Sequence, residues 1–200
     1  MHNAAAIHHA GTTEARIGPN ALIQSVNALR EQYNEARIRT ILCQCGQEDL
    51  LVTSPTTMVA EQAFADLVVA LADQLGIEPA QQILWRAGQL TAGYLLQHRI
   101  PRPFQWLLRP LPHRLALQLL LLAVGKHAWT FVGSGQFSYI VGKTPELTVL
   151  TCLYPGEAVC GFYGGTFDHL IHMLIAAQAQ TRVTTSLATG QTKCVYAIRF

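Results

Sequence analysis

One short stretch combines side chains suited to binding a flat, apolar ligand. Within residues 126–137 an imidazole, that of His127, is followed by large aromatic side chains and glycines. A neutral imidazole can ligate a metal ion, and aromatic faces stack on planar rings. The aromatic residues are Trp129, Phe131 and Phe137. The stretch predicts one wall of a ligand pocket; the alternative is a buried strand that ends in a turn.

A second group of side chains suited to metal or proton chemistry lies further along the chain. His169 and His172 are three residues apart and therefore share one face of a helix, with Asp168 beside them. The alternative is a partly exposed polar stripe without a ligand.

The five cysteines do not form a recognisable disulfide framework. Cys43 and Cys45 would lie about 200° apart around a helix, too far round to hold one ion together. Cys152, Cys160 and Cys194 are scattered, and the first residues lack the basic and apolar segments of a signal peptide. We therefore expect reduced thiols.

Composition favours one apolar domain. Of 200 residues, 50% are hydrophobic and 13% charged, so the chain can bury a large core and leave apolar surface for a ligand or a second subunit. A formal net charge of +2 is too small to suggest a nucleic-acid groove. The longest apolar run, from Leu115 to Val124, is shorter than the roughly 20 residues that span a bilayer. We expect a cytoplasmic protein.

Helical signals dominate the chain up to residue 126. Residues 1–16, which include His2, His8 and His9, show no periodicity and are expected to be a disordered tail. Helices are predicted from Pro19, over 36–44, from a cap at Thr56 or Thr57 to Gly76, from Pro79 to Pro101, and from His113 to Gly125. The last of these is apolar nearly all round, so we expect it to be central.

Strand signals replace helical ones after Ala128. Stretches rich in β-branched and aromatic residues predict strands over 129–141, 147–154, 182–189 and 193–200, with a hairpin turn at Ala188 to Gln191 and a helix over 163–178. The order of elements predicts an α+β fold: one domain over 17–200, with a helical half (17–126) packed on an antiparallel sheet (127–200).

Several motifs, in a consistent order, resemble one known family. They are Arg16-Ile17-Gly18-Pro19-Asn20, Trp85-Arg86-Ala87-Gly88, Tyr94-Leu95-Leu96, Arg99-Ile100-Pro101, and His127-Ala128-Trp129-Thr130-Phe131 with Gly133-Ser134-Gly135 and Phe137. After residue 15 the chain resembles the bacteriochlorophyll 4-vinyl reductase family, also called divinyl protochlorophyllide 8-vinyl reductases. The resemblance implies a 4-vinyl-reductase domain related in fold to small vesicle-tethering-complex subunits, with an apolar ligand cavity and a tendency to form homodimers.

Many members of the wider 4-vinyl-reductase domain family hold zinc with a late Glu-x-x-Cys, then Gly, then Cys. Here Gly190 and Cys194 match the end of that pattern, whereas Val183 and Ser186 stand in place of its Glu and first Cys. Neither replacement is a good Zn²⁺ ligand. Cys160 and Cys194 make only a partial ligand set, so we expect no structural zinc.

A reductase needs an electron donor, and the sequence shows no motif for one. Gly133-Ser134-Gly135 lies among strand signals, and Gly164-Gly165 lacks the rest of a dinucleotide-binding fingerprint, so each is expected to be a turn. The cysteines are too scattered for an iron–sulfur cluster. Whether the protein is an enzyme stays open, and binding is favoured over catalysis.

The resemblance leads to a specific functional hypothesis. We expect a carrier or accessory factor that binds a (divinyl) protochlorophyllide- or chlorophyllide-type Mg-tetrapyrrole and supports 8-vinyl reduction. It would work with other enzymes of bacteriochlorophyll biosynthesis, in the cytoplasm or at the periphery of the photosynthetic membrane. The alternatives are a true tetrapyrrole enzyme, acting on the vinyl group with an external donor or on the magnesium, a small-molecule sensor or assembly module, and a purely structural scaffold.

In this hypothesis His127 ligates the central Mg²⁺ or hydrogen-bonds a ring substituent, and the aromatic residues stack on the macrocycle. Arg99 and Arg102 pair with a propionate. The alternatives are that His127 only favours a helix C-terminus and that the arginines are solvated surface residues.

Overall fold

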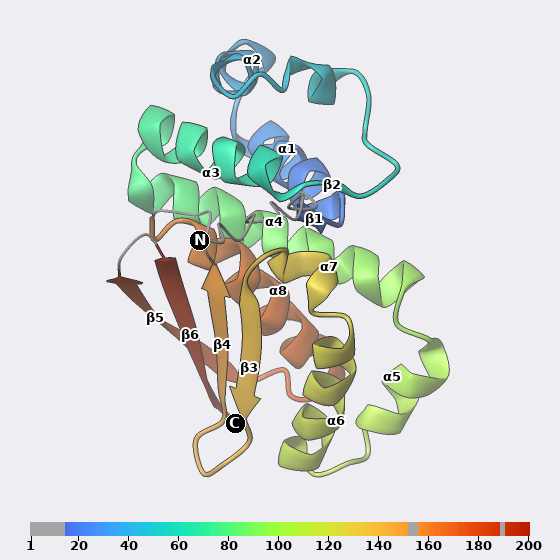
Figure 1. Ribbon diagram of the computed structural model, residues 1–200. Helices are drawn as coiled ribbons and strands as arrows, with labels where there is room; N and C mark the ends of the chain where they lie inside the picture. Colours follow the sequence, from blue (N-terminus) through green and yellow to red (C-terminus); the bar gives the residue numbers. More distant parts are fainter. Residues whose placement is uncertain (1–14, 152–155, 189–190) are drawn as a thin grey trace, which may run out of the picture.

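The computed structural model describes residues 15–151, 156–188 and 191–200. Helices cover one face of a four-stranded sheet (Figure 1). The helices are α1 (Asn20–Gln32), α2 (Glu35–Gln44), the 3-10 turn η1 (Glu48–Leu51), α3 (Glu61–Leu75), α4 (Ile77–His98), α5 (Arg102–Leu108), α6 (His113–Lys126), α7 (Trp129–Val132) and α8 (Val159–Leu174). The strands are β1 (Arg16–Ile17), β2 (Val59–Ala60), β3 (Gln136–Ile140), β4 (Glu146–Thr151), β5 (Gln180–Ala188) and β6 (Gln191–Arg199).

The main sheet is antiparallel throughout, in the order β3-β4-β6-β5. Side chains alternate along β4 and β6, so one face of the sheet is buried and the other is open to solvent. Helix α8 connects β4 to β5 and covers the buried face, and α4 packs on the far side of α8 (Figure 1). The predicted α+β class and antiparallel sheet are confirmed.

Glycines let α4 and α8 approach each other closely. A Cβ atom on Gly88 would lie 2.7 Å from the backbone nitrogen of Thr166, and one on Gly165 would lie 2.8 Å from the carbonyl carbon of Trp85. The hydroxyl of Thr166 also donates a hydrogen bond of 3.2 Å to the carbonyl of Gly88. The predicted turn at Gly164-Gly165 is therefore wrong, because both glycines lie inside α8 and serve this helix crossing.

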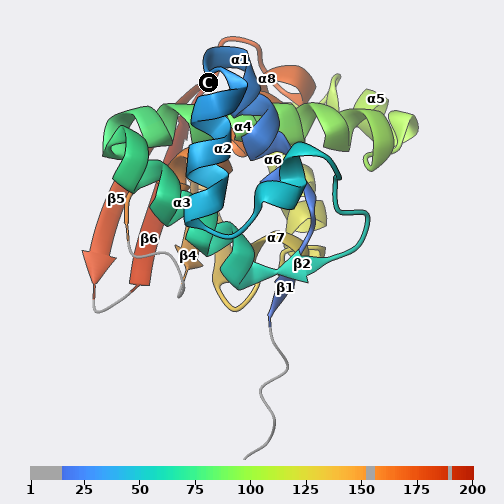
Figure 2. The ribbon, with the colours of Figure 1, turned by 90° about the horizontal axis from the view of Figure 1, so that it is seen from above.

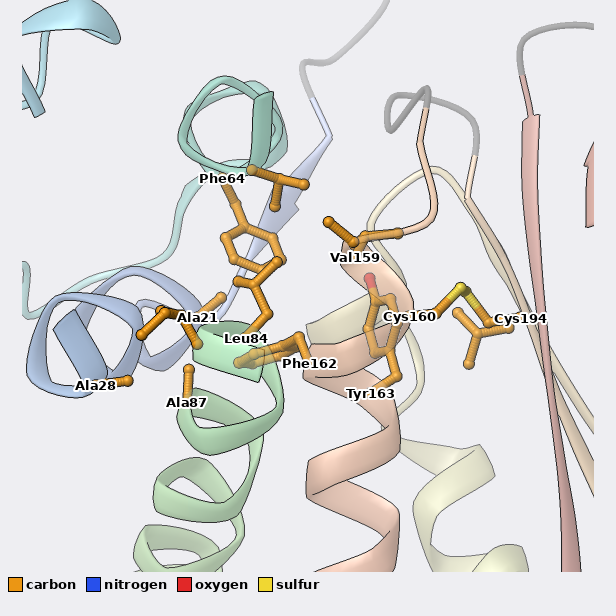
Figure 3. Close-up of a cluster of buried hydrophobic side chains, with 14 of the residues drawn as sticks. Ala21, Ala28, Phe64, Leu84, Ala87, Val159, Cys160, Phe162, Tyr163 and Cys194 are labelled. Atoms are coloured by element: carbon orange, nitrogen blue, oxygen red, sulfur yellow. A yellow bond between two sulfur atoms is a disulfide. The ribbon is translucent and has the colours of Figure 1, made fainter. Parts of the chain in front are cut away.

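The main hydrophobic core lies between the N-terminal helices, α4, α8 and the sheet. Figure 3 shows Phe64 of α3, Leu84 of α4 and Phe162 of α8 meeting there. A smaller cluster joins the ends of α4 and α8 to α5 and α6; its buried members are Ala92, Leu108, Ala116, Leu120, Leu170 and Leu174.

The prediction that the apolar helix from His113 is central is wrong. Helix α6 lies at the edge of the molecule, with Leu115 and Leu122 exposed (Figure 1). Only part of the apolar surface of α6 is buried against the rest of the protein. The centre is taken by α4 and α8, because small residues there allow a closer approach.

A disulfide joins Cys160, at the start of α8, to Cys194 on β6 (Figure 3). Both residues are buried, and their Cα atoms are 5.5 Å apart. The expectation of reduced thiols is therefore wrong for this pair, which the fold brings together across 34 residues of sequence. Cys43 is exposed and Cys45 half-buried, and both are free thiols.

Two predicted boundaries are also wrong. Residues 129–132 form helix α7 instead of strand, because the Val132 N–H bonds to the Ala128 carbonyl and closes a helical turn. The cap of the long helix is not at Thr56 or Thr57: residues 59–60 pair with β1, and α3 begins at Glu61.

The remaining predictions agree with the described residues or lie outside them. The helices over 36–44 and up to Pro101 are confirmed, as is the β5–β6 hairpin, in which Ala188 pairs with Gln191. The structure does not describe residues 1–14, 152–155 and 189–190. The predictions for the tail with its three histidines and for the tip of the hairpin therefore lie outside the described residues. Arg16 belongs to β1 and not to a disordered tail. Within the described ranges no helix combines the length and hydropathy needed to cross a bilayer.

Candidate ligand-binding site

An aromatic cluster forms where α7, β3 and α8 meet. Phe137 on β3 stacks on Phe167 of α8, with ring centroids 5.7 Å apart and an interplanar angle of 25°. Phe131 of α7 packs edge-on to both rings, at centroid distances of 5.7 and 6.3 Å, and Tyr139 extends the row along β3. Phe131, Phe137 and Tyr139 are half-buried. The structure thus brings together two of the predicted wall residues and adds Phe167 and Tyr139.

Two buried tyrosines form the floor beneath this aromatic cluster. Tyr163 donates a hydrogen bond of 3.3 Å to the carbonyl of Phe131, and Tyr196 donates one of 2.8 Å to the carbonyl of Cys160. Burial raises the pKa of the Tyr163 phenol, and the charge of Glu61 raises it further. Burial also raises the pKa of the Tyr196 phenol. Both hydroxyls therefore stay protonated and act as fixed donors.

The segment that carries the cluster is anchored from three sides. The Gly18 N–H donates to the Thr130 carbonyl at 2.8 Å, and the buried carboxylate of Glu61 accepts from the Ser134 N–H at 2.7 Å. The third anchor is the bond from Tyr163. Gly133 has φ +55°, and a Cβ there would lie 2.9 Å from Cγ of Glu61, so only glycine fits. The turn predicted around Gly133 is confirmed.

His127 and Trp129 form the exposed rim of the cluster. His127 follows the last residue of α6 and is exposed, and its carbonyl accepts from the N–H and the hydroxyl of Thr130. Trp129 is 62% exposed. At the same corner, a Cβ on Gly125 would lie 3.8 Å from the ring of Tyr139, so the end of α6 rests against β3. An imidazole and an indole therefore stand free beside half-buried aromatic rings.

Arg99 and Arg102 lie at another corner of the fold. Arg99 caps the C-terminus of α4 and Arg102 begins α5, and both are exposed. The chain thus carries them at the α4–α5 corner and not at α7 or β3.

His169 and His172 face away from the aromatic cluster, because they lie well round α8 from Phe167 at roughly 100° per residue. Nδ1 of His172 is 3.3 Å from the Asp168 carboxylate, and its Nε2–H donates to the Ala179 carbonyl at 2.6 Å. These two contacts of His172 tie the end of α8 to the segment before β5. Burial lowers the pKa of His169, and the neighbouring His172 lowers it further.

Metal ligands do not converge in the part of the chain that the structure describes. No group of three or more His, Cys, Asp or Glu side chains there could hold an ion. The sulfur atoms of Cys160 and Cys194 are bonded to each other.

Two hollows open on the N-terminal helices and not at the aromatic cluster. One, of about 360 Å³, is lined by Arg30, Tyr33, Glu35, Ile38 and Leu51. The other, of about 270 Å³, is lined by Gln44, Cys45, Asp66, Val69 and Ala70. Neither hollow borders the aromatic cluster. Because Phe131, Phe137 and Tyr139 are half-buried, a ligand at the cluster would lie on the exposed parts of these rings and on the rim, or displace α7 from β3.

Sequence reasoning missed part of this site. Phe167 lies within the helix predicted over 163–178 and Glu61 within the helix predicted to end at Gly76, and neither residue belongs to the predicted ligand wall. Tyr139 and Tyr163 fell inside predicted elements without a role. Only the contact of α8 with β3 and α7 brings these residues together.

Two curated relatives resemble the chain. A protein named bacteriochlorophyll synthase 23 kDa chain from Cereibacter sphaeroides is 30% identical over 187 residues, covering 90% of this chain and 88% of that protein. The protein of the same name from Rhodobacter capsulatus is 38% identical over 125 residues, 62% of this chain and 57% of that protein. No family model matches the chain.

Solved H-NOX structures resemble the fold. A Cs H-NOX mutant carrying 4-cyano-L-phenylalanine at site 5 has a TM-score of 0.58 and 10% identity, covering 92% of this chain and 96% of that one. A structure described as modulating heme redox potential through protein-induced porphyrin distortion has a TM-score of 0.57 and 10% identity, covering 92% and 100%. An oxygen-binding H-NOX domain related to soluble guanylate cyclases has a TM-score of 0.55 and 12% identity, covering 90% and 92%. At these identities the likeness shows the fold alone.

Proposed function

This chain belongs to the family of the bacteriochlorophyll synthase 23 kDa chain, and from that premise we propose that it binds a (divinyl) protochlorophyllide- or chlorophyllide-type tetrapyrrole. The family's name supports a role in bacteriochlorophyll biosynthesis. Within that role, the protein carries or presents the pigment and supports reduction of its 8-vinyl group.

The aromatic cluster with its exposed rim is the observation that carries the proposal. A tetrapyrrole is flat and apolar, and its central magnesium takes an axial nitrogen ligand. Half-buried Phe131 and Phe137 supply apolar ring surface, Trp129 supplies a free indole face, and His127 supplies a free imidazole on the same segment. Each well-placed aromatic pair contributes about 0.5–1.5 kcal/mol beyond the area it buries.

The structural neighbours support the choice of ligand class. One of the H-NOX structures is described by the distortion that its protein imposes on a porphyrin. A porphyrin and a protochlorophyllide share the same planar macrocycle. In this chain, displacement of the α6–α7 corner from β3 would expose Phe137 and Tyr139, and β3 lies at the edge of the sheet, where a shift leaves the β4–β6 pairing intact.

The polar groups near the rings favour binding over catalysis. The hydroxyls of Tyr163 and Tyr196 already donate to backbone carbonyls, and burial holds their pKa values above the ordinary range. Neither is poised to give a proton to a vinyl carbon near neutral pH. His127 lies at the rim, where its role is to hold the pigment.

Titration of the purified, metal-defined protein with divinyl protochlorophyllide tests this function. Pigment absorption and fluorescence are followed with and without NADPH. Saturable binding without change at the vinyl group supports a carrier. Vinyl loss in the presence of NADPH identifies an enzyme, and absence of binding refutes the proposal.

Matched variants locate the site. We expect Trp129→Ala and Phe137→Ala each to weaken binding by about five- to tenfold, because each removes a stacking face. Trp106→Ala is the control for Trp129→Ala: Trp106 is 64% exposed but lies on α5. His127→Ala should also shift the absorption of the bound pigment, whereas His98→Ala, at the exposed end of α4, should leave it unchanged.

A further inference from the structure

Helix α5 directs large apolar side chains into solvent. Trp106 is 64% exposed and Leu107 54% exposed, whereas the next residue, Leu108, is fully buried in the smaller hydrophobic cluster. Leu108 therefore anchors the helix while its other face is left uncovered. Both ribbon views show α5 at one edge of the molecule (Figures 1 and 2).

The α5 corner is built as a rigid support. The side-chain amide of Gln105 donates to the carbonyls of Leu96 and Ile100, at 2.7 and 2.8 Å, and so ties α5 to the end of α4. Pro101 and Pro112 fix the backbone before α5 and before α6. The exposed side chains are thus presented by a preordered segment, which lowers the entropy lost when they bind a partner.

Charge is distributed very unevenly along the chain. Residues 1–78 contain 9 acidic and 4 basic side chains, and residues 146–200 contain 3 of each. Residues 79–145, which include α5, contain 7 basic side chains and no acidic one. The small net charge of +2 therefore conceals a strongly basic stretch, and the exposed residues Arg99, Arg102 and Arg109 from it border Trp106 and Leu107 in sequence.

We propose that the α5 corner docks the protein on an anionic lipid bilayer. Tryptophan favours the interface between headgroups and acyl chains, leucine enters the apolar boundary, and arginine contacts lipid phosphates while its stem lies against apolar surface. Arg99, Arg102 and Arg109 supply the charge, and Trp106 and Leu107 the apolar insertion. This surface is separate from the aromatic cluster and stands whether or not the pigment proposal holds.

Flotation of the full chain with vesicles tests the proposal. We expect partition onto phosphatidylcholine vesicles containing 30 mol% phosphatidylglycerol, about a hundredfold weaker partition onto pure phosphatidylcholine, where the attraction of all three arginines is lost, and loss of binding as salt is raised. Arg102→Gln with Arg109→Gln should weaken partition by about 25-fold, at about fivefold per charge. Trp106→Ser with Leu107→Ser should weaken it by about tenfold or more.

Control variants separate the α5 corner from general effects. Arg182→Gln with Lys193→Gln removes two exposed charges from the open face of the sheet, and Val52→Ser alters a side chain that is 90% exposed elsewhere. Both should float like the native chain. In Trp106→Phe, partition should persist while the vesicle-induced blue shift of tryptophan emission is lost.

Three results would overturn the proposal. They are no partition of the native chain onto anionic vesicles, equal partition of the α5 variants and the controls, and self-association through α5 without vesicle binding. Light scattering of native and Trp106→Ser chains reports the last case. Thermal unfolding of each variant, expected within about 2 °C of the native chain for exposed positions, checks that the fold is intact.

Discussion

Replacing Gly88 by alanine should separate the two central helices. The added methyl group would meet the nitrogen of Thr166 at 2.7 Å and the carbonyl carbon of Gly165 at 3.1 Å, and both atoms belong to backbone that cannot rotate away. Overpacking of this kind costs about 1–3 kcal/mol. Loss of the Thr166–Gly88 hydrogen bond adds about 1 kcal/mol, and alanine's helix propensity returns about as much. The expected net loss of stability is about 1–3 kcal/mol.

Gly93 provides a matched control in the same helix. No atom lies within 4 Å of a Cβ placed there, so Gly93→Ala should stabilise the protein by about 0.5–1 kcal/mol. Urea denaturation of both variants, followed by circular dichroism, measures the difference, and thermal midpoints should move by about 2–4 °C per kcal/mol. Equal stabilities for the two variants would refute the close crossing of α4 and α8.

Three further predictions concern other contacts. Cys160→Ala with Cys194→Ala should lower the free energy of unfolding by about 3–4 kcal/mol, because the disulfide spans 34 residues; unchanged urea midpoints with and without reductant would contradict this. Glu61→Ala should cost about 1–3 kcal/mol by removing the acceptor of the Ser134 N–H, and Glu61→Gln should cost less because it retains an oxygen; the opposite ranking in urea would exclude the anchor role. Burial lowers the pKa of His169, so the unfolded state binds a proton at this imidazole more readily than the folded state. The contribution of His169 to the free energy of unfolding should therefore be fully present above pH about 6.5 and be lost as the pH falls below it. His169→Gln should flatten that decline in midpoints measured from pH 7.5 to 5, and an unchanged decline would refute it.

The sequence predicted correctly those helices and strands whose ends are fixed by residues close to them in the chain. Gly76, with φ +90°, ends α3 where a glycine was expected to stop a helix, and Pro101 follows the end of α4. The β-branched and aromatic residues of β4 and β6 also predicted these strands, whose side chains alternate between a buried face and a solvated face. These features require only nearby residues, which is why the fold class was accessible from sequence.

Features that depend on distant partners were not accessible. Residues 129–132 have strand-forming types, but Gly18 and Tyr163, both remote in sequence, bond to their carbonyls and hold a helical turn. Gly164 and Gly165 looked like a turn because their partner, α4, lies far upstream.

The candidate site was predictable in part for the same reason. Phe131 and Phe137 fall within seven residues of each other, so their spacing could suggest a common wall, and the structure brings them into contact. Phe167 completes this wall, but it lies on α8, which follows β3 and β4 in the chain. The stacking partner of a ring cannot be read from the ring's own neighbours in the chain.

The position of α4 between α1 and α8 has a consequence for synthesis. While the ribosome makes the chain, α4 can pack against α1 and α3 at once, but its glycine-lined side has no partner until Val159 to Leu174 has emerged. Between the synthesis of His98 and that of Leu174, the nascent chain therefore carries half of a core with an uncovered apolar side, a state prone to aggregation. We therefore expect chains truncated before α8 to be insoluble and the nascent chain to need a chaperone during this interval. Both expectations follow from the order in which the two central helices are made.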